Sequence, residues 1–164
     1  MKLLGHIDIL RKIKRITIEI LEKNYQEKEI ILAGINKNGT AFAKLLFDEC
    51  TKRGNQQYTL TTITLSPANP LERKVEAGLP VEYFTDKLII IVDDVANTGR
   101  TIFYAIKPFL DVLPGKVEVA VLVDRKHKSF PVKVDYMGLS LATTLQENIS
   151  VNLSEKDNYS VYLD

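Results

Sequence analysis

The sequence predicts an α/β fold, with one mainly parallel, twisted sheet, helices on both of its faces and a small hood. Two observations lead to this prediction. Three short apolar runs, Ile30–Gly34, Leu88–Val92 and Val117–Val123, have the length and composition of buried strands. Segments with apolar residues at helical spacing lie between them. Buried strands that alternate with helices are typical of a parallel sheet, because each crossover helix covers one of its faces.

The N-terminal helix is predicted first. Its apolar stripe consists of Ile9, Ile13, Ile16 and Ile20, with Asp8 as a candidate N-cap and Asn24 as a candidate stop. The later elements are expected as a helix over Ala41–Glu49, a strand over Tyr58–Leu65, a long loop over Ser66–Pro80, a helix over Thr101–Leu113 that Pro108 should bend, and short strands at Lys133–Met137, Ile149–Leu153 and Ser160–Leu163. The length of 164 residues suits one domain, residues 1–164, with the hood mainly within 124–164.

Composition excludes several classes of protein. The chain has 22 lysines and arginines against 21 acidic residues, so no global charge excess indicates a nucleic-acid or membrane partner. Its 45% hydrophobic and 26% charged residues exclude a disordered chain. Its apolar runs are too short to span a bilayer, and charged residues interrupt the N-terminus where a leader would be apolar. A single cysteine, Cys50, excludes an intrachain disulfide framework, and we expect a cytoplasmic protein.

The stretch Leu88–Thr101 carries the chemistry. A buried strand ends in two adjacent acids, Asp93 and Asp94, and a Thr-Gly turn then leads into a helix. Ligands of open α/β sheets bind beyond the carboxyl ends of the strands. The turn presents backbone N–H groups that suit a phosphate, and the carboxylates beside it can accept hydrogen bonds from sugar hydroxyls. The pattern therefore indicates a phosphorylated ribose. The alternative is a solvated acidic strand end followed by an ordinary helix cap.

This stretch resembles the phosphoribosyl-pyrophosphate motif of the type I phosphoribosyltransferases. The resemblance implies the single-domain type I fold, and it implies that Asp93 and Asp94 hold the ribose hydroxyls and, partly through the ligand, Mg²⁺. It assigns the 5′-phosphate to Asn97, Thr98, Gly99, Arg100 and Thr101.

A second loop, Gly34–Gly39, follows the first buried strand. In the family the loop at this place gives backbone amides to the pyrophosphate, so the resemblance adds Asn36, Lys37, Asn38 and Gly39 to the binding residues, with Lys37 as a catalytic charge beside the two acids. Taken alone, a loop bounded by glycines before a helix is equally well an ordinary turn.

The segment Asp124–Gly138 narrows the family. It is similar to the base-binding region of the pyrimidine operon attenuator and uracil phosphoribosyltransferase family (PyrR), and the resemblance covers nearly the whole chain. It implies base contacts from Asp124, Arg125, Tyr136 and Met137, with the Tyr136 ring stacked on the base and main-chain groups around Met137 reading its edge. Without this context, Tyr136 would be read as a core aromatic residue.

The sequence departs from the family pattern in two places that affect chemistry. Asn97 stands where purine-specific relatives have an aspartate, which argues for a pyrimidine. Ser66–Asn69 replaces the Tyr-Arg-Asp-Asp of the attenuator family at the start of the loop Ser66–Pro80. We expect that loop to be mobile without ligand, and its changes to make turnover slow or absent.

Two functions follow from the resemblance. The first is transfer of ribose 5-phosphate from phosphoribosyl pyrophosphate to a nucleobase, with uracil expected and Mg²⁺ as cofactor. The second is a nucleotide-sensing regulator that binds RNA with weak or no catalysis. Candidate RNA contacts are Lys14, Arg15, His127, Lys128 and Lys133, which could equally be solvated surface. The family also implies a homodimer or a higher homo-oligomer.

Overall fold

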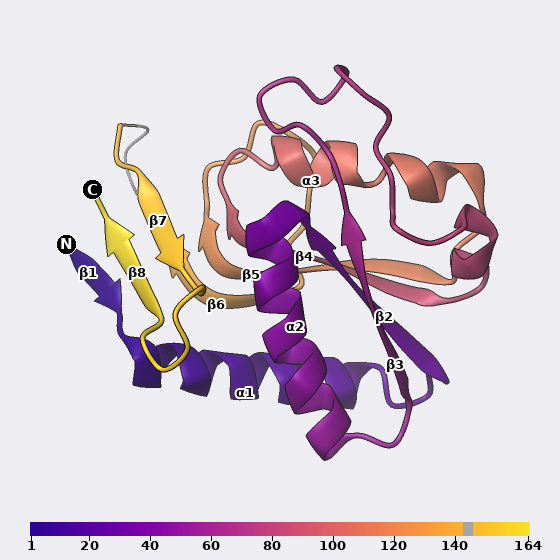
Figure 1. Ribbon diagram of the computed structural model, residues 1–164, viewed down its shortest axis with the longest axis horizontal. Coiled ribbons are helices and arrows are strands. Elements are labelled where there is room, and N and C mark those ends of the chain that lie inside the picture. Colours follow the sequence, from indigo (N-terminus) through magenta and orange to yellow (C-terminus); the bar gives the residue numbers. More distant parts are fainter. Residues whose placement is uncertain (143–145) are drawn as a thin grey trace.

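The computed structural model describes residues 1–142 and 146–164, and its main body is a five-stranded parallel sheet (Figure 1). The strands, in spatial order, are β3 (Gln57–Ile63), β2 (Glu29–Ile35), β4 (Leu88–Ala96), β5 (Lys116–Arg125) and β6 (Tyr136–Leu141). The three central strands β2, β4 and β5 contain the three apolar runs, so their prediction is confirmed.

Helices cover both faces of this sheet, as the sequence predicts. On one face α1 (His6–Lys23) and α2 (Asn36–Arg53) bury their apolar residues in one core cluster. On the other face α3 (Arg100–Ala105) and two 3₁₀ helices, η1 (Val81–Phe84) and η2 (Lys107–Asp111), bury a second cluster. In the part of the chain that the structure describes, no helix combines the length and the apolar character needed to cross a membrane.

The helix boundaries refine two predictions. The N-cap of α1 is Gly5, so Asp8 stands at the third helical position, where its carboxylate accepts a hydrogen bond of 3.0 Å from the Gly5 amide. The predicted end at Asn24 is confirmed, since Asn24 is the C-cap. The predicted helix Thr101–Leu113 is broken after Ala105 and continues as η2, which fits the expected effect of Pro108.

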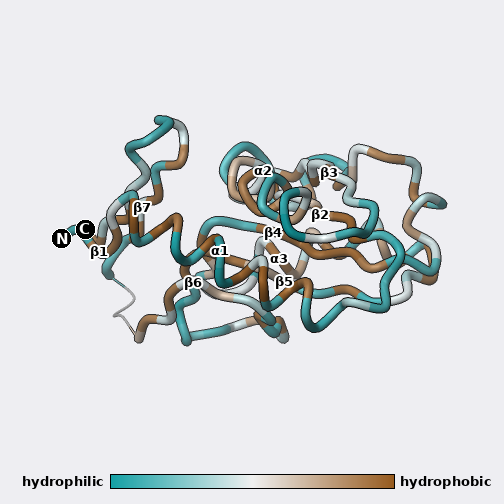
Figure 2. The backbone as a smooth tube through the Cα atoms, turned by 90° about the horizontal axis from the view of Figure 1, so that it is seen from below, coloured by the Kyte–Doolittle hydropathy of each residue, from teal (hydrophilic) through white to brown (hydrophobic). Residues whose placement is uncertain are grey.

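The hood is a separate antiparallel sheet of three strands in the order β1-β8-β7. Its strands are β1 (Lys2–Leu4), β7 (Ile149–Asn152) and β8 (Ser160–Leu163), and Figures 1 and 2 show it at the end of the molecule that holds both termini. The hood was predicted mainly within 124–164. That range contains β7 and β8, whereas β6 of the same range pairs with β5 as the edge of the main sheet. Three residues of that range, 143–145, lie outside the described residues.

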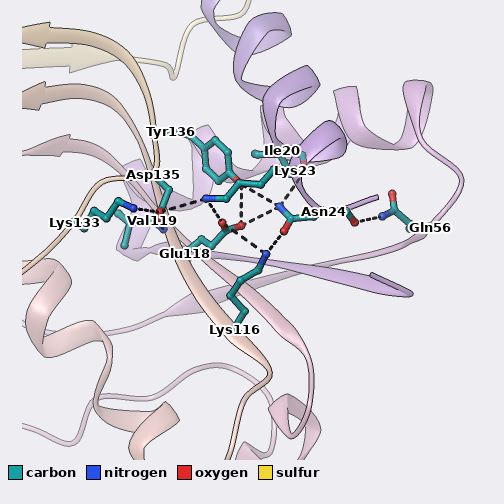
Figure 3. Close-up of polar contacts among 10 residues, drawn as sticks. All are labelled: Ile20, Lys23, Asn24, Gln56, Lys116, Glu118, Val119, Lys133, Asp135 and Tyr136. Atoms are coloured by element: carbon teal, nitrogen blue, oxygen red, sulfur yellow. Dashed lines mark hydrogen bonds and ion pairs between the residues drawn. The ribbon is translucent and has the colours of Figure 1, made fainter. Parts of the chain in front are cut away.

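A buried polar network fixes the C-terminal end of α1 to the sheet (Figure 3). Glu118 of β5 is buried, and its carboxylate accepts hydrogen bonds from the Tyr136 hydroxyl (2.8 Å) and the Asn24 amide (2.9 Å). Lys23 lies 2.8 Å away as its ion-pair partner. Burial alone raises the pKa of Glu118, but the groups of Lys23, Tyr136 and Asn24 outweigh it, so the pKa is lowered overall. The buried Glu118 carboxylate therefore has both hydrogen-bond donors and a cationic partner.

The network predicts the effect of removing one hydroxyl. The Tyr136→Phe variant should lose about 2 kcal/mol of unfolding free energy, because a buried hydrogen bond to a carboxylate disappears while the ring still packs. Urea denaturation of the two proteins measures the difference. The control is Tyr25→Phe, since Tyr25 is 72% exposed and should tolerate the change. Equal stability of Tyr136→Phe and the unmodified chain would contradict a structural role for this hydroxyl.

Candidate active site

The carboxyl ends of β2 and β4 bring two distant segments together. The predicted loop Gly34–Gly39 was wrong, because β2 ends at Ile35 and α2 begins at Asn36, so residues 36–39 form the first turn of a helix. The two strands are parallel neighbours with Gly34 opposite Val92, so the residues that follow each strand emerge at the same edge of the sheet. The first turn of α2 packs directly on the end of β4. A Cβ atom on Gly39 would stand 2.6 Å from the Val92 carbonyl oxygen, so only glycine permits this approach. Gly39 thus allows the first turn of α2 to lie against the end of β4.

A cavity of about 430 Å³ lies between these segments. It brings together most of the residues predicted for phosphoribosyl pyrophosphate, namely Asn36, Lys37, Asn38, Asp93, Asp94, Asn97 and Thr101. It is also lined by four residues that the sequence analysis missed, Ile35, Pro67, Val95 and Ile149. The juxtaposition of the two predicted segments is therefore present in the structure.

The two acids of β4 have different surroundings. Asp93 is buried, and its carboxylate accepts the Asp94 amide at 2.9 Å. Burial, and then the negative charge of Asp94, raise the pKa of Asp93 well above its ordinary value. Asp94 is more accessible and accepts the Asn38 side-chain amide at 3.3 Å. Among the described residues neither acid has an ion-pair partner, so the pair suits a ligand that brings hydroxyl groups or a cation.

The first turn of α2 forms the wall opposite the acids. Its backbone N–H groups, at Asn36, Lys37 and Asn38, have no partner within the helix, and they form the positive end of the helix dipole. Lys37 is exposed and adds a full positive charge beside the cavity. This wall suits a multiply charged anion such as a pyrophosphate.

The Asn36 side chain makes its hydrogen bonds within the protein. Its backbone has a left-handed φ of 51°, and its amide makes two hydrogen bonds to the backbone of Leu65, one donated at 2.9 Å and one accepted at 3.0 Å. It therefore ties the start of α2 to the end of β3. Only the backbone of Asn36 remains for the predicted ligand contact.

A second, smaller cavity of about 50 Å³ is built from the turn between β4 and α3. Its lining includes Asn97, Thr98, Gly99, Arg100 and Thr101, all five of the residues predicted to wrap the 5′-phosphate. Gly99 has a left-handed φ of 86° and caps α3. The Arg100 guanidinium turns away and donates to the Ala68 carbonyl at 3.3 Å, so this residue offers its backbone to the cavity. We call residues 97–101 the phosphate loop.

Comparisons with known proteins agree with this geometry. The phosphoribosyl transferase domain model matches residues 2–157. A relative named bifunctional protein PyrR from Streptococcus agalactiae is 36% identical over 162 residues, covering 96% of this chain and 92% of the relative. A second PyrR, from Pediococcus pentosaceus, is 32% identical over 162 residues, covering 93% and 92%.

The chain belongs to the phosphoribosyltransferase family, in its PyrR branch.

Solved structures of other proteins are similar to this chain in fold. The hypoxanthine phosphoribosyltransferase of Trypanosoma cruzi matches with a TM-score of 0.78 at 16% identity, covering 98% of this chain and 94% of that one. A hypoxanthine-guanine phosphoribosyltransferase from Bacillus anthracis gives 0.71 at 20% identity, covering 85% and 81%. The predicted type I phosphoribosyltransferase fold is confirmed.

The base contacts predicted for this phosphoribosyltransferase at β6 are wrong. Tyr136 is 2% exposed and its ring lies under α1, with its hydroxyl in the network around Glu118. The carbonyl of Met137 accepts the Arg15 guanidinium at 2.9 Å, and Met137 pairs with Val121 inside the sheet. Neither residue lines the cavity, because the register of β6 on β5 places them away from its carboxyl edge.

The hood contributes one apolar residue to the lining of the site. Ile149, at the start of β7, is the hood residue that lines the 430 Å³ cavity. Sequence reasoning had no local signal for this placement, since it depends on how the hood sits over the main sheet. Asp124 and Arg125 lie at the end of β5 and do not line the cavity. Arg125 still reaches its rim, because its guanidinium donates to the Asn97 side-chain oxygen at 3.2 Å.

The long loop Ser66–Pro80 is held at both ends. Val75 and Ala77 are buried in the second core cluster, and Pro67 lines the cavity. Leu71–Lys74, at the tip, is exposed. The predicted mobility therefore concerns the tip, where it stays a prediction.

The RNA candidates divide into two groups. Arg15 donates to the carbonyls of Met137 and Gly138, and Lys128 forms an ion pair with Asp124, so both side chains have structural partners. The remaining three candidates, Lys14, His127 and Lys133, are exposed, and Lys133 also forms an ion pair of 3.8 Å with Asp135.

The raised pKa of Asp93 predicts a pH-dependent gain in stability for Asp93→Asn. A raised pKa in the folded state means that folded protein loses stability as pH rises through that pKa. Asparagine cannot ionise, so the variant should unfold a few degrees higher at pH 8, and the difference should shrink toward pH 4. Scanning calorimetry across this range measures it.

The control for that series is Asp111→Asn, an exposed aspartate that should show no pH-dependent difference. An Asp93→Asn midpoint at pH 8 equal to or below that of the unmodified chain would show that Asp93 carries no buried-charge penalty.

Proposed function

We propose that the protein transfers ribose 5-phosphate from phosphoribosyl pyrophosphate to uracil and releases pyrophosphate. One observation carries this proposal, namely that the walls of two adjoining cavities match the three parts of that substrate. The phosphate loop matches the 5′-phosphate, the Asp93–Asp94 pair matches the ribose hydroxyls, and the first turn of α2 matches the pyrophosphate.

The residues fit a magnesium ion that arrives with the substrate. The described residues contain no cluster of three or more histidine, cysteine, aspartate or glutamate side chains that could hold a metal ion. Asp93 and Asp94 offer two carboxyl groups to the cavity, without an ion-pair partner among the described residues, and oxygen ligands are those that Mg²⁺ prefers. Bound there with the substrate, Mg²⁺ would neutralise part of the pyrophosphate charge.

The protein's own groups supply positioning and charge stabilisation. As the bond from C1 of the ribose to the pyrophosphate breaks, negative charge grows on the leaving group and positive charge on the sugar. The N–H groups at the start of α2 and the Lys37 ammonium face the leaving group. Asp94, on the opposite wall, orients the sugar. The catalytic roles predicted from the sequence are therefore proposed for Lys37 and the two acids. As the bond from C1 to the uracil nitrogen N1 forms, the N1 proton passes to solvent, so the step needs no proton acceptor at Asn97.

Uracil is the base that the site supports best. Asn97 cannot exchange a proton with a ring nitrogen at neutral pH, unlike the aspartate of purine-specific relatives. The base would lie on the hood side of the cavity, against Ile149 and near Asn97. The relatives that share most of the chain are named PyrR, which agrees with a pyrimidine.

Regulation through RNA is a second function that one observation favours. Arg11 and Lys14 lie on the exposed face of α1 and have no ion-pair partner among the described residues, so both charges remain for a phosphate backbone. The relatives are named bifunctional. A homo-oligomer and a cytoplasmic location stay predictions.

The transfer reaction is tested by uracil-dependent release of pyrophosphate from phosphoribosyl pyrophosphate with Mg²⁺. We expect slow but measurable release with uracil and less with hypoxanthine or guanine. Asp94→Asn should lower kcat/KM by about 10- to 100-fold, because hydrogen bonds to a charged partner are lost. Asp111→Asn, far from the cavity, is the matched control. Faster release with hypoxanthine than with uracil would overturn the pyrimidine assignment, and no release with any base would leave only the regulatory function.

The regulatory function is tested by filter binding of a randomised pool of RNA hairpins, with and without uridine monophosphate. Lys14→Glu should weaken binding several-fold and flatten its salt dependence, because one phosphate contact becomes repulsive. Lys52→Glu, at the far end of α2, is the control and should bind as the unmodified chain does. Equal binding by the two variants would remove α1 from any RNA interface.

A further inference from the structure

The segment between β5 and β6 folds back onto the phosphate loop. We call residues 126–132 the covering segment. The amides of Ser129 and Phe130 both donate to the Thr98 carbonyl, at 3.0 and 3.2 Å. Phe130 also packs on Phe103 of α3, with 5.4 Å between the ring centroids. Two donors on one carbonyl fix the orientation of the peptide that joins Thr98 to Gly99.

That orientation decides whether the phosphate loop can receive an anion. In a trans peptide the carbonyl and the following N–H point in opposite directions. With the Thr98 carbonyl directed at the covering segment, the Gly99 N–H points to the other side. The small cavity lies on that side, since Gly99 lines it and the covering segment does not. A reversed peptide would place a carbonyl oxygen against the phosphate and repel it.

Lys128 connects the covering segment to the end of β5. Its ammonium donates to the Asp124 carboxylate at 2.7 Å and also to the Arg125 carbonyl. Its aliphatic stem lies against Gly99, where an added Cβ would stand 3.4 Å from the Lys128 Cδ atom and 3.3 Å from the Val132 Cβ atom. The Lys128 side chain is 19% exposed, so it is mostly enclosed by these contacts.

These contacts argue against two other roles for Lys128. Its ammonium is already paired, so it is poorly placed to serve as a surface charge for RNA. It lines neither of the two cavities assigned to the substrate, so it does not offer its charge to the phosphate directly.

We propose that Lys128 is a positioning residue for the phosphate loop. Its ion pair with Asp124 holds the covering segment so that the Ser129 and Phe130 amides keep the Thr98 carbonyl turned away from the bound phosphate. We call the ion pair between Lys128 and Asp124, together with the two hydrogen bonds to the Thr98 carbonyl, the latch. The effect of the latch on phosphate binding rests on the proposed function, whereas the latch itself is present without ligand.

Binding measurements test the ligand side. Calorimetric titration with uridine monophosphate should show about tenfold weaker affinity for Lys128→Met and for Asp124→Asn, and Lys128→Arg should restore most of it. The double variant should be no worse than either single one, because both remove the same latch. Affinity for uridine, which lacks the phosphate, should not change. Tighter nucleotide binding by Asp124→Asn would overturn the proposal, since it would mean that Lys128 acts on the phosphate by charge.

Hydrogen exchange in the ligand-free protein tests the latch independently of the proposed function. The Ser129 and Phe130 amides should exchange about tenfold faster in Lys128→Met than in the unmodified chain, while the Val92 amide in the centre of the sheet should not change. Unchanged exchange at both positions would refute the latch. Failure of the unmodified chain to bind the nucleotide would refute the proposed function, and the exchange result would still decide the latch.

Discussion

The site depends on one close contact, that of the first turn of α2 with the end of β4. Because Gly39 has no side chain, the helix can lie against the Val92 carbonyl and cover Asp93. This contact buries the first acid of the pair and raises its pKa. It also brings Asn38 within hydrogen-bond distance of Asp94 and points the free N–H groups of α2 at the same cavity. A larger residue at position 39 would separate the two segments that make up the site.

Two buried acidic side chains, at opposite ends of the sheet, have opposite electrostatic surroundings. At the amino end of β5, Glu118 is surrounded by Lys23, Tyr136 and Asn24, and its pKa is lowered. At the carboxyl end of β4, Asp93 is buried beside a second acid and has no ion-pair partner in the part of the chain that the structure describes, and its pKa is raised. The first arrangement stabilises the fold by fixing α1. The second costs stability when Asp93 ionises and places its carboxyl group where a ligand can interact with it, as binding sites commonly do.

The parts of the site that the sequence predicted are those encoded by contiguous residues. The run from Leu88 to Thr101 contains a strand, two acids and a turn, so its structure and chemistry follow from local pattern. Tyr136 was misplaced because its environment depends on the register of β6 against β5 and on the packing of α1. Ile149 was missed for the same reason, since only the position of the hood over the main sheet brings it to the cavity. No local motif predicts the hydrogen bond from the Asn36 side chain to the Leu65 backbone or the ion pair of Lys128 with Asp124.

The central claim is that the first turn of α2 and the phosphate loop form one site for a ribose phosphate. The most direct measurement is the change in backbone amide resonances when uridine monophosphate is added to the protein. The account predicts that the amide resonances of residues 36–39 and 93–101 shift together with a single dissociation constant, while the resonance of Tyr136 does not change. Shifts centred on Tyr136, or two segments that respond at different concentrations, would contradict it.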